Sequence, residues 1–248
     1  MRRGYWPCRR KNQIAVSWRW YENWPSGGSR PAKARSRASS FVTALPIKKS
    51  LQAAERERAD VAKARRRWIR EQGLLDPAHL VFIDETSINT SMTRLRGRSP
   101  RGEPLIDHVP LAHWTTLTFV AALRHDKMVA PMVIEGAMTS ELFRSYVEKF
   151  LVPTLKRKDI VIVDHLQAHK APGVREAIER AGATLRYLPQ YSPELNPIEM
   201  PFHPFKEFLR SVAARTVPAL YRAIRLYLRA LTPEEIANYF RHAGYASV

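Results

Sequence analysis

Two short runs of branched and aromatic residues in this chain each end in an aspartate. The first run, residues 80–83, is followed by Asp84, and the second, residues 160–163, is followed by Asp164. Apolar runs of this length and composition are typical of buried β-strands. A side chain at the carboxyl end of a strand lies at the edge of an open α/β sheet, where such sheets bind ligands. The two aspartates are therefore expected at one edge of a sheet.

The order of the expected elements indicates a fold class. The hydrophobic pattern predicts strands over residues 80–85, 115–123, 128–134, 160–164 and 184–188, and helices over residues 139–155, 172–181 and from 197 onward. Right-handed crossover connections would place the first and fourth strands parallel and side by side. The order βββαβαβα, with flanking helices, is that of the ribonuclease-H-like α/β fold with a mixed five-stranded sheet.

A third acid, Glu199, closes the motif Tyr-Ser-Pro-Glu-Leu-Asn-Pro-Ile-Glu. Asn196 and Pro197 match a helix N-cap and a first-turn proline, and Glu199 matches the acid of a capping box, so the motif predicts the start of a helix. Pro201 and Pro204 follow. Because proline cannot donate a backbone hydrogen bond, they predict a kinked or delayed start.

Asp84, Asp164 and Glu199 are the candidate catalytic and metal-binding residues. Each one alone has a structural explanation, as the last residue of a strand or as a capping residue. Together they favour a functional explanation, because carboxylates that lie side by side repel each other unless a cation binds between them. Mg²⁺ and Mn²⁺ prefer carboxylate oxygen, and two such ions stabilise both the attacking and the leaving oxygen in phosphodiester cleavage. The three acids therefore predict a site for two Mg²⁺ or Mn²⁺ ions.

The charge of the chain indicates a polyanionic partner. The formal net charge is +18, and residues 1–50 alone contain 12 Lys and Arg but a single acid, Glu22. For such a basic protein the partner is most often nucleic acid, with a membrane surface as the weaker alternative. The sequence has no apolar stretch long enough to span a membrane, and its one cysteine, Cys8, forms no intrachain disulfide. We therefore expect a cytoplasmic, nucleoid-associated protein without a membrane partner.

Composition also divides the chain. Residues 1–47 are rich in Arg, Pro, Ser and Trp without a sustained helical or strand period, which predicts a basic, poorly ordered segment. Residues 48–75 set apolar residues among charges at helical spacing, which predicts a linker helix that ends near Gly73. Residues 76–248 then form the expected catalytic domain, in which Trp114 is predicted to lie in the core.

Four arginines lie between the first two expected strands, at Arg94, Arg96, Arg98 and Arg101. They have two interpretations. Arginine offers bidentate contacts to phosphate, so the loop would clamp the DNA backbone. Alternatively, it is an ordinary solvated run of charge.

Two further patterns are excluded as sites. His165 and His169 are spaced as in a zinc-binding helix, but Leu166 stands where a zinc protease has its glutamate, and no third ligand is evident. Residues 97–102 have the glycine spacing of a phosphate-binding loop, but Glu103 stands where that loop requires lysine. Neither a zinc site nor a nucleotide site is expected.

The acidic motifs resemble those of a known family. The sequence around Asp84, Asp164 and Glu199 is similar to that of DDE transposases of the mariner superfamily, specifically the bacterial insertion-sequence branch. The resemblance covers residues 48–240, and the 34 residues between the second and third acid match the spacing typical of that group. His169 and Lys170 match family positions near the active site; alternatively, they are an ordinary surface His-Lys pair.

The resemblance implies a function. Asp84 would bind both metal ions, and Asp164 and Glu199 would each complete the ligands of one ion. Water would cleave a phosphodiester bond at the end of the element, and the freed 3′-hydroxyl would attack target DNA. The implied partners are the transposon ends, the target DNA and a second copy in a synapsed homodimer, with His169 and Lys170 among the DNA-binding residues.

The sequence departs from the family pattern in two places. His165 stands where the family has asparagine, so a titratable ring replaces an amide and would make the activity pH-sensitive or abolish it. Residues 1–47 show no counterpart of the family's N-terminal helix-turn-helix domains, which suggests a truncated copy or a segment translated in a shifted frame. Two alternatives therefore stay open: a non-catalytic DNA-binding remnant, and a ribonuclease-H-like nuclease that cleaves branched or hybrid substrates.

Overall fold

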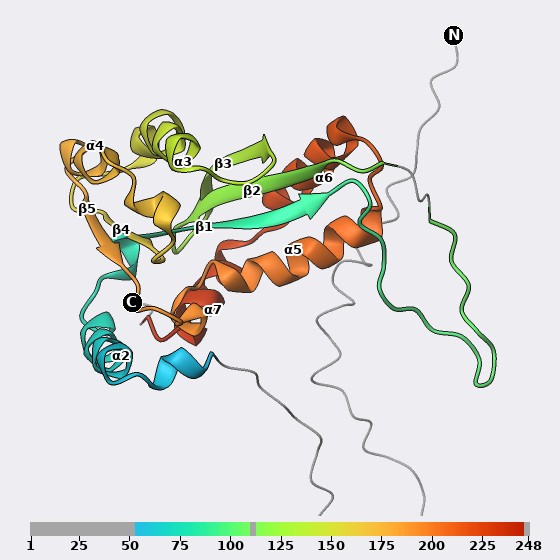
Figure 1. The fold of residues 1–248 in the computed structure, drawn as a ribbon, viewed down its shortest axis with the longest axis horizontal. Helices are drawn as coiled ribbons and strands as arrows, with labels where there is room; N and C mark the ends of the chain where they lie inside the picture. The colour runs from blue at the N-terminus through green and yellow to red at the C-terminus, as the bar shows by residue number, and fades with distance from the viewer. Residues whose placement is uncertain (1–52, 110–112, 246–248) are drawn as a thin grey trace, which may run out of the picture. The chain divides into compact units, whose positions relative to one another are not determined.

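Within residues 53–109 and 113–245, which this computed structural model describes, five strands form one mixed sheet (Figure 1). The strands are β1 (Leu80–Asn89), β2 (Thr116–Leu123), β3 (Met128–Glu135), β4 (Ile160–Val163) and β5 (Thr184–Tyr187). Their order across the sheet is β3-β2-β1-β4-β5. β1, β2 and β3 are antiparallel neighbours, whereas β4 runs parallel to β1, and β5 parallel to β4. The predicted ribonuclease-H-like sheet is confirmed.

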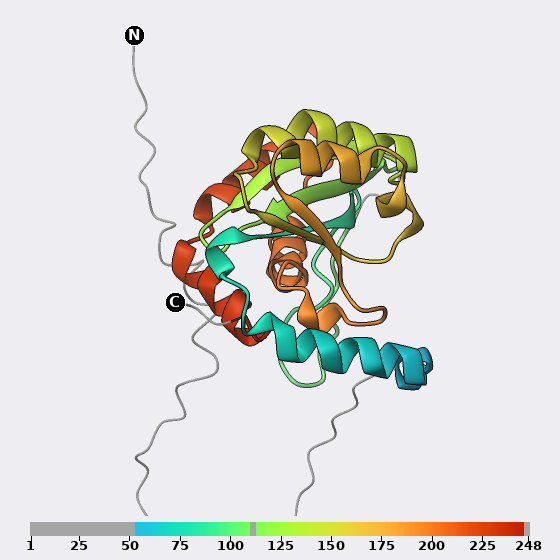
Figure 2. The ribbon, with the colours of Figure 1, turned by 90° about the vertical axis from the view of Figure 1, so that its left-hand side faces the viewer.

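Helices cover both faces of this sheet. They are α2 (Ala59–Gln72), α3 (Ser140–Tyr146), α4 (Val174–Arg180), α5 (Glu199–Val212), α6 (Val217–Ala230) and α7 (Pro233–His242). α3 and α4 lie on one face, and α5 lies on the other face together with α2 (Figure 2). The helix expected over residues 139–155 is not continuous. α3 gives way to a π-helical turn at Val147–Leu151 before Pro153, whose ring nitrogen cannot donate the next helical hydrogen bond.

Alternate side chains of β1 enter two separate cores. Leu80 and Phe82 pack with apolar residues of α5, α6 and α7, whereas Val81 and Ile83 pack with residues of α3 and α4. Successive side chains of a strand point to opposite faces of the sheet, so a strand that is buried on both faces is apolar throughout. Asp84 is two residues after Phe82, so its side chain points to the same face of the sheet, the α5 face. The apolar run ends at this position.

α2 is fastened to the C-terminal part of the described chain. The Trp68 indole Nε1 donates to the Tyr245 hydroxyl at 3.0 Å, and that hydroxyl donates to the carbonyl of Leu195 at 2.9 Å. Trp68 also belongs to the apolar cluster on the α5 face. The helix ends at Gln72, directly before Gly73, where the sequence places its end. α2 therefore packs as part of the same body as the sheet.

Two predictions from the sequence concern residues outside the sheet. Trp114 is 60% exposed, so the prediction that it lies in the core is wrong. It precedes β2 in the connection from β1, where strand alternation no longer buries a side chain. The segment predicted over residues 1–47 lies outside the described residues, so the division into basic segment, linker helix and catalytic domain stays a prediction. None of the described helices is long and apolar enough to cross a membrane.

Candidate functional site

Asp84 and Asp164 belong to neighbouring parallel strands. β1 pairs with β4 in a register that sets Phe82 opposite Ile162, and each aspartate lies two residues beyond this pair. Residues two apart along a strand share a face, so Asp84 continues the α5 face of β1, whereas Asp164 lies just past the end of β4. Glu199 is the first residue of α5 itself. The three predicted acids thus come from β1, the end of β4 and the start of α5.

The carboxyl groups of these acids lie close enough to repel one another. Asp84 is 8% exposed, and burial, followed by the negative charge of Glu199, raises the pKa of Asp84 well above its usual value. Glu199 is more exposed. Partial burial raises its pKa and the charges of Asp164 and Glu85 raise it further, whereas a hydrogen bond with Asp84 and the charge of Lys206 lower it. Glu85 therefore belongs to the cluster as a fourth acid, which the sequence analysis missed.

Two hydrogen bonds orient the Asp84 carboxylate. The backbone N–H of Glu85 donates to Oδ1 at 2.8 Å, and the side-chain amide of Asn196 donates to Oδ2 at 2.9 Å. The other amide atom of Asn196, Oδ1, is buried without a hydrogen-bond partner in the described part of the chain. Asn196 is therefore a second residue of the site that the sequence analysis did not assign to it.

This contact of Asn196 corrects the capping prediction. α5 begins at Glu199, and its N-cap residue makes no side-chain hydrogen bond within the described chain. The Asn196 amide is turned toward Asp84, and its oxygen accepts no N–H of the described helix start. The helix start is delayed, as predicted. The delay changes which helical hydrogen bonds the two prolines remove. Pro201 now lies in the first turn, where a missing N–H removes no helical hydrogen bond, and Pro204 lies inside the helix.

The loop before α5 is anchored by α2. Arg65 is 8% exposed, donates to the Ser192 hydroxyl at 2.5 Å and to the Tyr191 carbonyl at 3.4 Å, and pairs with Glu194. Tyr191 has a φ of +53°, a left-handed conformation that few residues other than glycine adopt. The contacts from Arg65 hold the loop in this conformation, and the loop carries Asn196 to Asp84.

His169 connects two acids of the cluster. Its ring is fully buried, Nδ1 lies 2.6 Å from Asp164 Oδ1, and Nε2 lies 3.1 Å from Glu85 Oε2. Burial lowers the pKa of His169, but the hydrogen bonds with the two carboxylates outweigh it and raise the pKa to about 9. Burial raises the pKa of Asp164, but hydrogen bonds from His169 and the Leu166 N–H outweigh it and lower the pKa. His169 is therefore an imidazolium between two carboxylates at neutral pH.

The position of His169 corrects the prediction that it contacts DNA. A side chain with no exposed surface cannot reach a phosphate. The sequence identified the residue but not its environment, because its partner Glu85 lies 84 positions away. Lys170, by contrast, is exposed, and its contact with DNA stays a prediction.

His165 lies at the side of the cluster. Its ring centroid is 5.4 Å from that of Tyr187, and its buried Nδ1 has no hydrogen-bond partner among the described residues. Burial, and after it the positive charge of Lys170, lowers the pKa of His165. The ring is therefore neutral where the resembled family has an amide, and its effect on activity stays a prediction.

The basic loop lies in the connection between β1 and β2, which extends beyond the sheet (Figure 1). All four of its arginines are exposed, at Arg94, Arg96, Arg98 and Arg101. Exposure agrees with both interpretations of the loop, as a phosphate clamp and as a solvated charged segment. Its role in DNA binding therefore stays a prediction.

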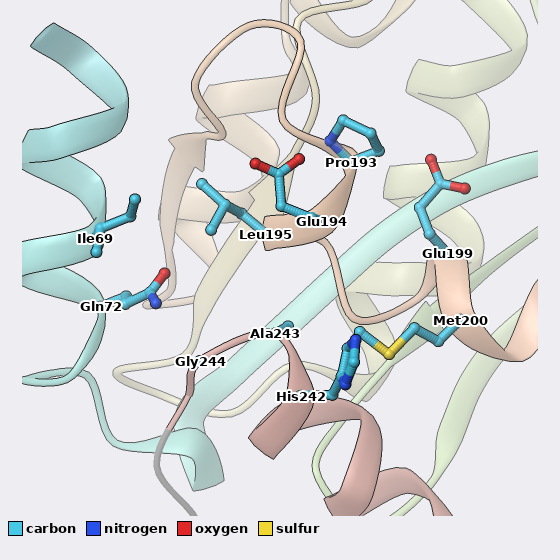
Figure 3. A pocket seen from close by; sticks show the side chains of 10 residues that line it. All are labelled: Ile69, Gln72, Pro193, Glu194, Leu195, Glu199, Met200, His242, Ala243 and Gly244. Atoms are coloured by element: carbon cyan, nitrogen blue, oxygen red, sulfur yellow. The ribbon is translucent and has the colours of Figure 1, made fainter. Parts of the chain in front are cut away.

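An open pocket of about 510 Å³ adjoins Glu199 (Figure 3). Its walls are α2, the turn before α5 and the end of α7, and apolar side chains such as Ile69, Leu195 and Met200 line it. Glu199 is the one candidate acid in its lining. The pocket therefore lies beside the carboxylate cluster and is not the predicted metal site.

The acids of the cluster have the donor chemistry that a hard divalent cation requires. Burial contributes most to the raised pKa values of Asp84 and Glu199, and repulsion between the acids, which a bound cation would offset, adds to it. Across residues 53–109 and 113–245, however, no group of three or more His, Cys, Asp or Glu side chains is arranged to hold a metal ion. Asp164 Oδ1 is instead engaged by His169 and the Leu166 N–H. The donor set fits Mg²⁺ or Mn²⁺ in its chemistry, and metal binding stays a prediction.

Comparison with known proteins matches most of this region to one family. Residues 79–220, which include Asp84, Asp164 and Glu199, match the family described as DDE superfamily endonuclease. No curated protein sequence matches the chain significantly.

Solved structures of the Mos1 transposase share the fold. The pre-cleavage Mos1 transpososome matches with a TM-score of 0.64 at 13% identity, over 82% of this chain and 65% of that chain. The Mos1 mariner paired end complex with Mn matches with a TM-score of 0.66 at 12% identity, over 81% and 63% of the two chains. The catalytic domain of Mos1 mariner transposase matches with a TM-score of 0.56 at 13% identity, over 81% and 92%. The chain thus spans less than two thirds of the longer Mos1 chains and most of the catalytic domain.

Proposed function

Because the chain belongs to the DDE superfamily of endonucleases, we propose that it is the catalytic domain of a DDE transposase of the mariner superfamily, from the bacterial insertion-sequence branch. It cleaves DNA at the ends of an insertion sequence and joins the freed 3′ ends to target DNA. The observation that supports this most directly is the cluster of Asp84, Glu199 and Asp164, in which the buried Asp84 carboxyl group is repelled by two more accessible ones. Such a cluster is unfavourable in a purely structural role and typical of functional sites.

In this proposal the acids bind metal, and neighbouring residues orient them. In this proposal Asp84, Asp164 and Glu199 hold two Mg²⁺ or Mn²⁺ ions, which when bound stabilise the attacking and leaving oxygens of the phosphodiester. Asn196 orients the Asp84 carboxylate, and Arg65 fixes the loop that carries Asn196. Groups that are oriented before the DNA arrives do not have to be ordered during the reaction.

The proposed partners are transposon ends and target DNA. The exposed basic side chains that would contact phosphates are Arg94, Arg96, Arg98, Arg101 and Lys170. Because the similar Mos1 structures include a transpososome and a paired end complex, we propose that this chain also acts as a homodimer on two DNA ends. A DNA substrate agrees with a cytoplasmic, nucleoid-associated location.

Cleavage and strand transfer test the proposal. The substrate is DNA that carries the terminal repeats of the element, and the assay is run in Mg²⁺ and in Mn²⁺. Wild type should cleave and join it, and Asp84→Asn should reduce both to background while DNA binding is kept, because a neutral amide does not balance two cations. The matched control is Asp126→Asn, the same change in the exposed turn between β2 and β3, which should cleave like wild type.

The two alternatives give different results in the same assay. A non-catalytic remnant would bind DNA and show no metal-dependent cleavage in the wild type. A nuclease for branched or hybrid substrates would cleave them without preference for the terminal repeats. Equal cleavage by wild type and Asp84→Asn would remove the proposed mechanism.

The basic loop has its own test. Triple replacement of Arg94, Arg96 and Arg101 by alanine should weaken DNA binding and flatten its salt dependence, by a log-log slope of about 0.9 for each phosphate that the loop no longer neutralises. The control is the same triple replacement on the exposed side of α6, at Arg222, Arg225 and Arg229. If the two variants bind DNA alike at every salt concentration, only net charge matters and the loop is an ordinary solvated segment.

A further inference from the structure

His169 is the most enclosed member of the acidic cluster. It lies in the short helical turn Gln167–Lys170, and its side chain is fully buried, whereas the side chain of Asp164 is 38% exposed and that of Glu85 is 16% exposed. Nδ1 contacts Asp164 at 2.6 Å, and Nε2 contacts Glu85 at 3.1 Å. The histidine therefore joins a half-exposed carboxylate to an inner one on the neighbouring strand.

The ring of His169 has a fixed orientation. It packs on Phe143 of α3 with the ring centroids 4.2 Å apart, and the Tyr187 hydroxyl of β5 donates to the His169 carbonyl at 3.3 Å. Both ring nitrogens face carboxylate oxygens, which accept hydrogen bonds, so both nitrogens donate. A rotation of the ring would break two charged hydrogen bonds away from water.

We propose that His169, held by Glu85, is a positioning residue that orients the Asp164 carboxylate for metal binding. Both hydrogen bonds that Asp164 accepts from the described residues, from His169 and from the Leu166 N–H at 2.9 Å, end on Oδ1. This leaves Oδ2 to a divalent cation. The inference rests on the proposed function, since the cation concerned is the one used in DNA cleavage. Partners that orient a metal ligand in this way typically change metal affinity or activity by about 10–100-fold.

Two substitutions of His169 separate its two contacts. In His169→Asn the amide nitrogen is as many bonds from Cα as Nδ1 is, so it still reaches Asp164. In His169→Gln the amide nitrogen is as many bonds from Cα as Nε2 is, so it reaches Glu85 and the bond to Asp164 is broken. A purely structural role would make the two variants similarly defective, whereas a positioning role makes His169→Asn the better metal binder.

The measurements are the Mn²⁺ affinity of the DNA-free protein, by isothermal titration calorimetry, and the Mn²⁺ concentration that half-saturates DNA cleavage. We expect His169→Gln to weaken both by about 10–100-fold and His169→Asn to recover most of the loss. The control is His125→Gln, the same substitution in the exposed turn before β3, which should leave both values unchanged.

A second pair of variants tests the contact between His169 and Glu85 by changing Glu85. It serves if the histidine variants do not fold. Glu85→Ala removes the acceptor that fixes Nε2, and Glu85→Gln restores an acceptor without restoring the charge. Because the two variants lose the same charge, a weaker Mn²⁺ affinity of Glu85→Ala than of Glu85→Gln reports on orientation. Equal affinities of these two variants, or of His169→Asn and His169→Gln, would overturn the inference.

Cleavage separates this inference from the proposed function. A wild type that binds Mn²⁺ but does not cleave DNA contradicts the proposed function alone. A wild type that cleaves DNA, with unchanged metal affinity in His169→Gln and Glu85→Ala, contradicts the inference alone. A wild type that binds no Mn²⁺ contradicts both.

Discussion

The two ends of β4 carry aspartates in opposite circumstances. Asp159 precedes the strand and is fully buried, and it accepts hydrogen bonds from the Arg124 guanidinium on both carboxylate oxygens and from the Lys156 N–H at 2.7 Å. Asp164 follows the strand and contacts His169, but it lies beside Asp84 and Glu199, whose pKa values burial and neighbouring acids raise. A strand of four residues therefore separates a balanced buried charge from a group in which acids outnumber the positive charges beside them.

This difference shows what each charge does. The guanidinium and backbone donors make Asp159 a structural contact that ties the end of β2 to the start of β4. Carboxylates that share a site without enough positive charge reduce the free energy of unfolding, and proteins keep such groups where a bound cation restores the balance. The same residue type thus contributes to stability at one end of the strand and to the proposed function at the other.

The largest effect on stability is expected at the balanced end. Asp159→Asn leaves the Arg124 side chain, which is 4% exposed, without its counter-charge, and breaking a buried ion pair in this way costs about 3–5 kcal/mol. Urea unfolding of the metal-free protein measures the change. The control is Asp126→Asn in the exposed turn, with an expected change within about 0.5 kcal/mol. A loss no larger than that of the control would mean that the pair is dispensable and that the two ends do not contrast.

The sequence predicted the acidic end of β4 better than the balanced end. Asp84 and Asp164 each follow an apolar run, and strand alternation with right-handed crossovers is enough to set them on adjacent strands. Asp159 precedes such a run and has no distinguishing pattern. Its partner Arg124 lies 35 positions earlier, at the end of β2, and only the assembled sheet brings the two together.

The sequence did not predict the contacts of side chains that have several possible hydrogen-bond partners. Asn196 has the local signal of a helix cap, yet it donates to Asp84, 112 positions away. His169 precedes an exposed lysine, yet its ring is buried against Phe143. In both cases a hydrogen bond inside the protein, where the dielectric constant is low, overrides the local pattern. Asp84 and Asp164 were found because each follows an apolar run, and Glu199 because it closes a distinctive motif.

A smaller effect, of opposite sign, is expected at the acidic end. Asp84→Asn removes one negative charge from the cluster and should raise the free energy of unfolding of the metal-free protein at pH 8 by about 0.5–2 kcal/mol, the usual range for a stabilising substitution. The new amide has a partner available. A 180° rotation of the Asn196 amide would present its Oδ1, which is buried without a partner in the described chain, to the new N–H group.

The pH dependence of this gain follows from the pKa values of Asp84 and Glu199, which burial and neighbouring acids raise. A carboxyl group with a higher pKa in the folded protein contributes stability below its unfolded pKa, which is about 4, and the contribution is lost as the pH rises through the folded pKa. The contribution of Asp84 and Glu199 to the stability of the metal-free wild type should therefore fall as the pH rises above about 4, so wild type should lose stability relative to Asp84→Asn. At pH 4 the two proteins should be nearly equal.

A divalent cation should reverse the order of the two stabilities. Mn²⁺ at 100 times its dissociation constant stabilises a folded protein by about 2.7 kcal/mol, and Asp84→Asn, which lacks one of the proposed ligands, should gain much less. Urea unfolding at pH 4, 6 and 8, in EDTA and in Mn²⁺, measures both effects. If Asp84→Asn is less stable than wild type at pH 8 in EDTA, the negative charges of the cluster are already balanced without a cation. The two ends of β4 would then not differ in charge balance.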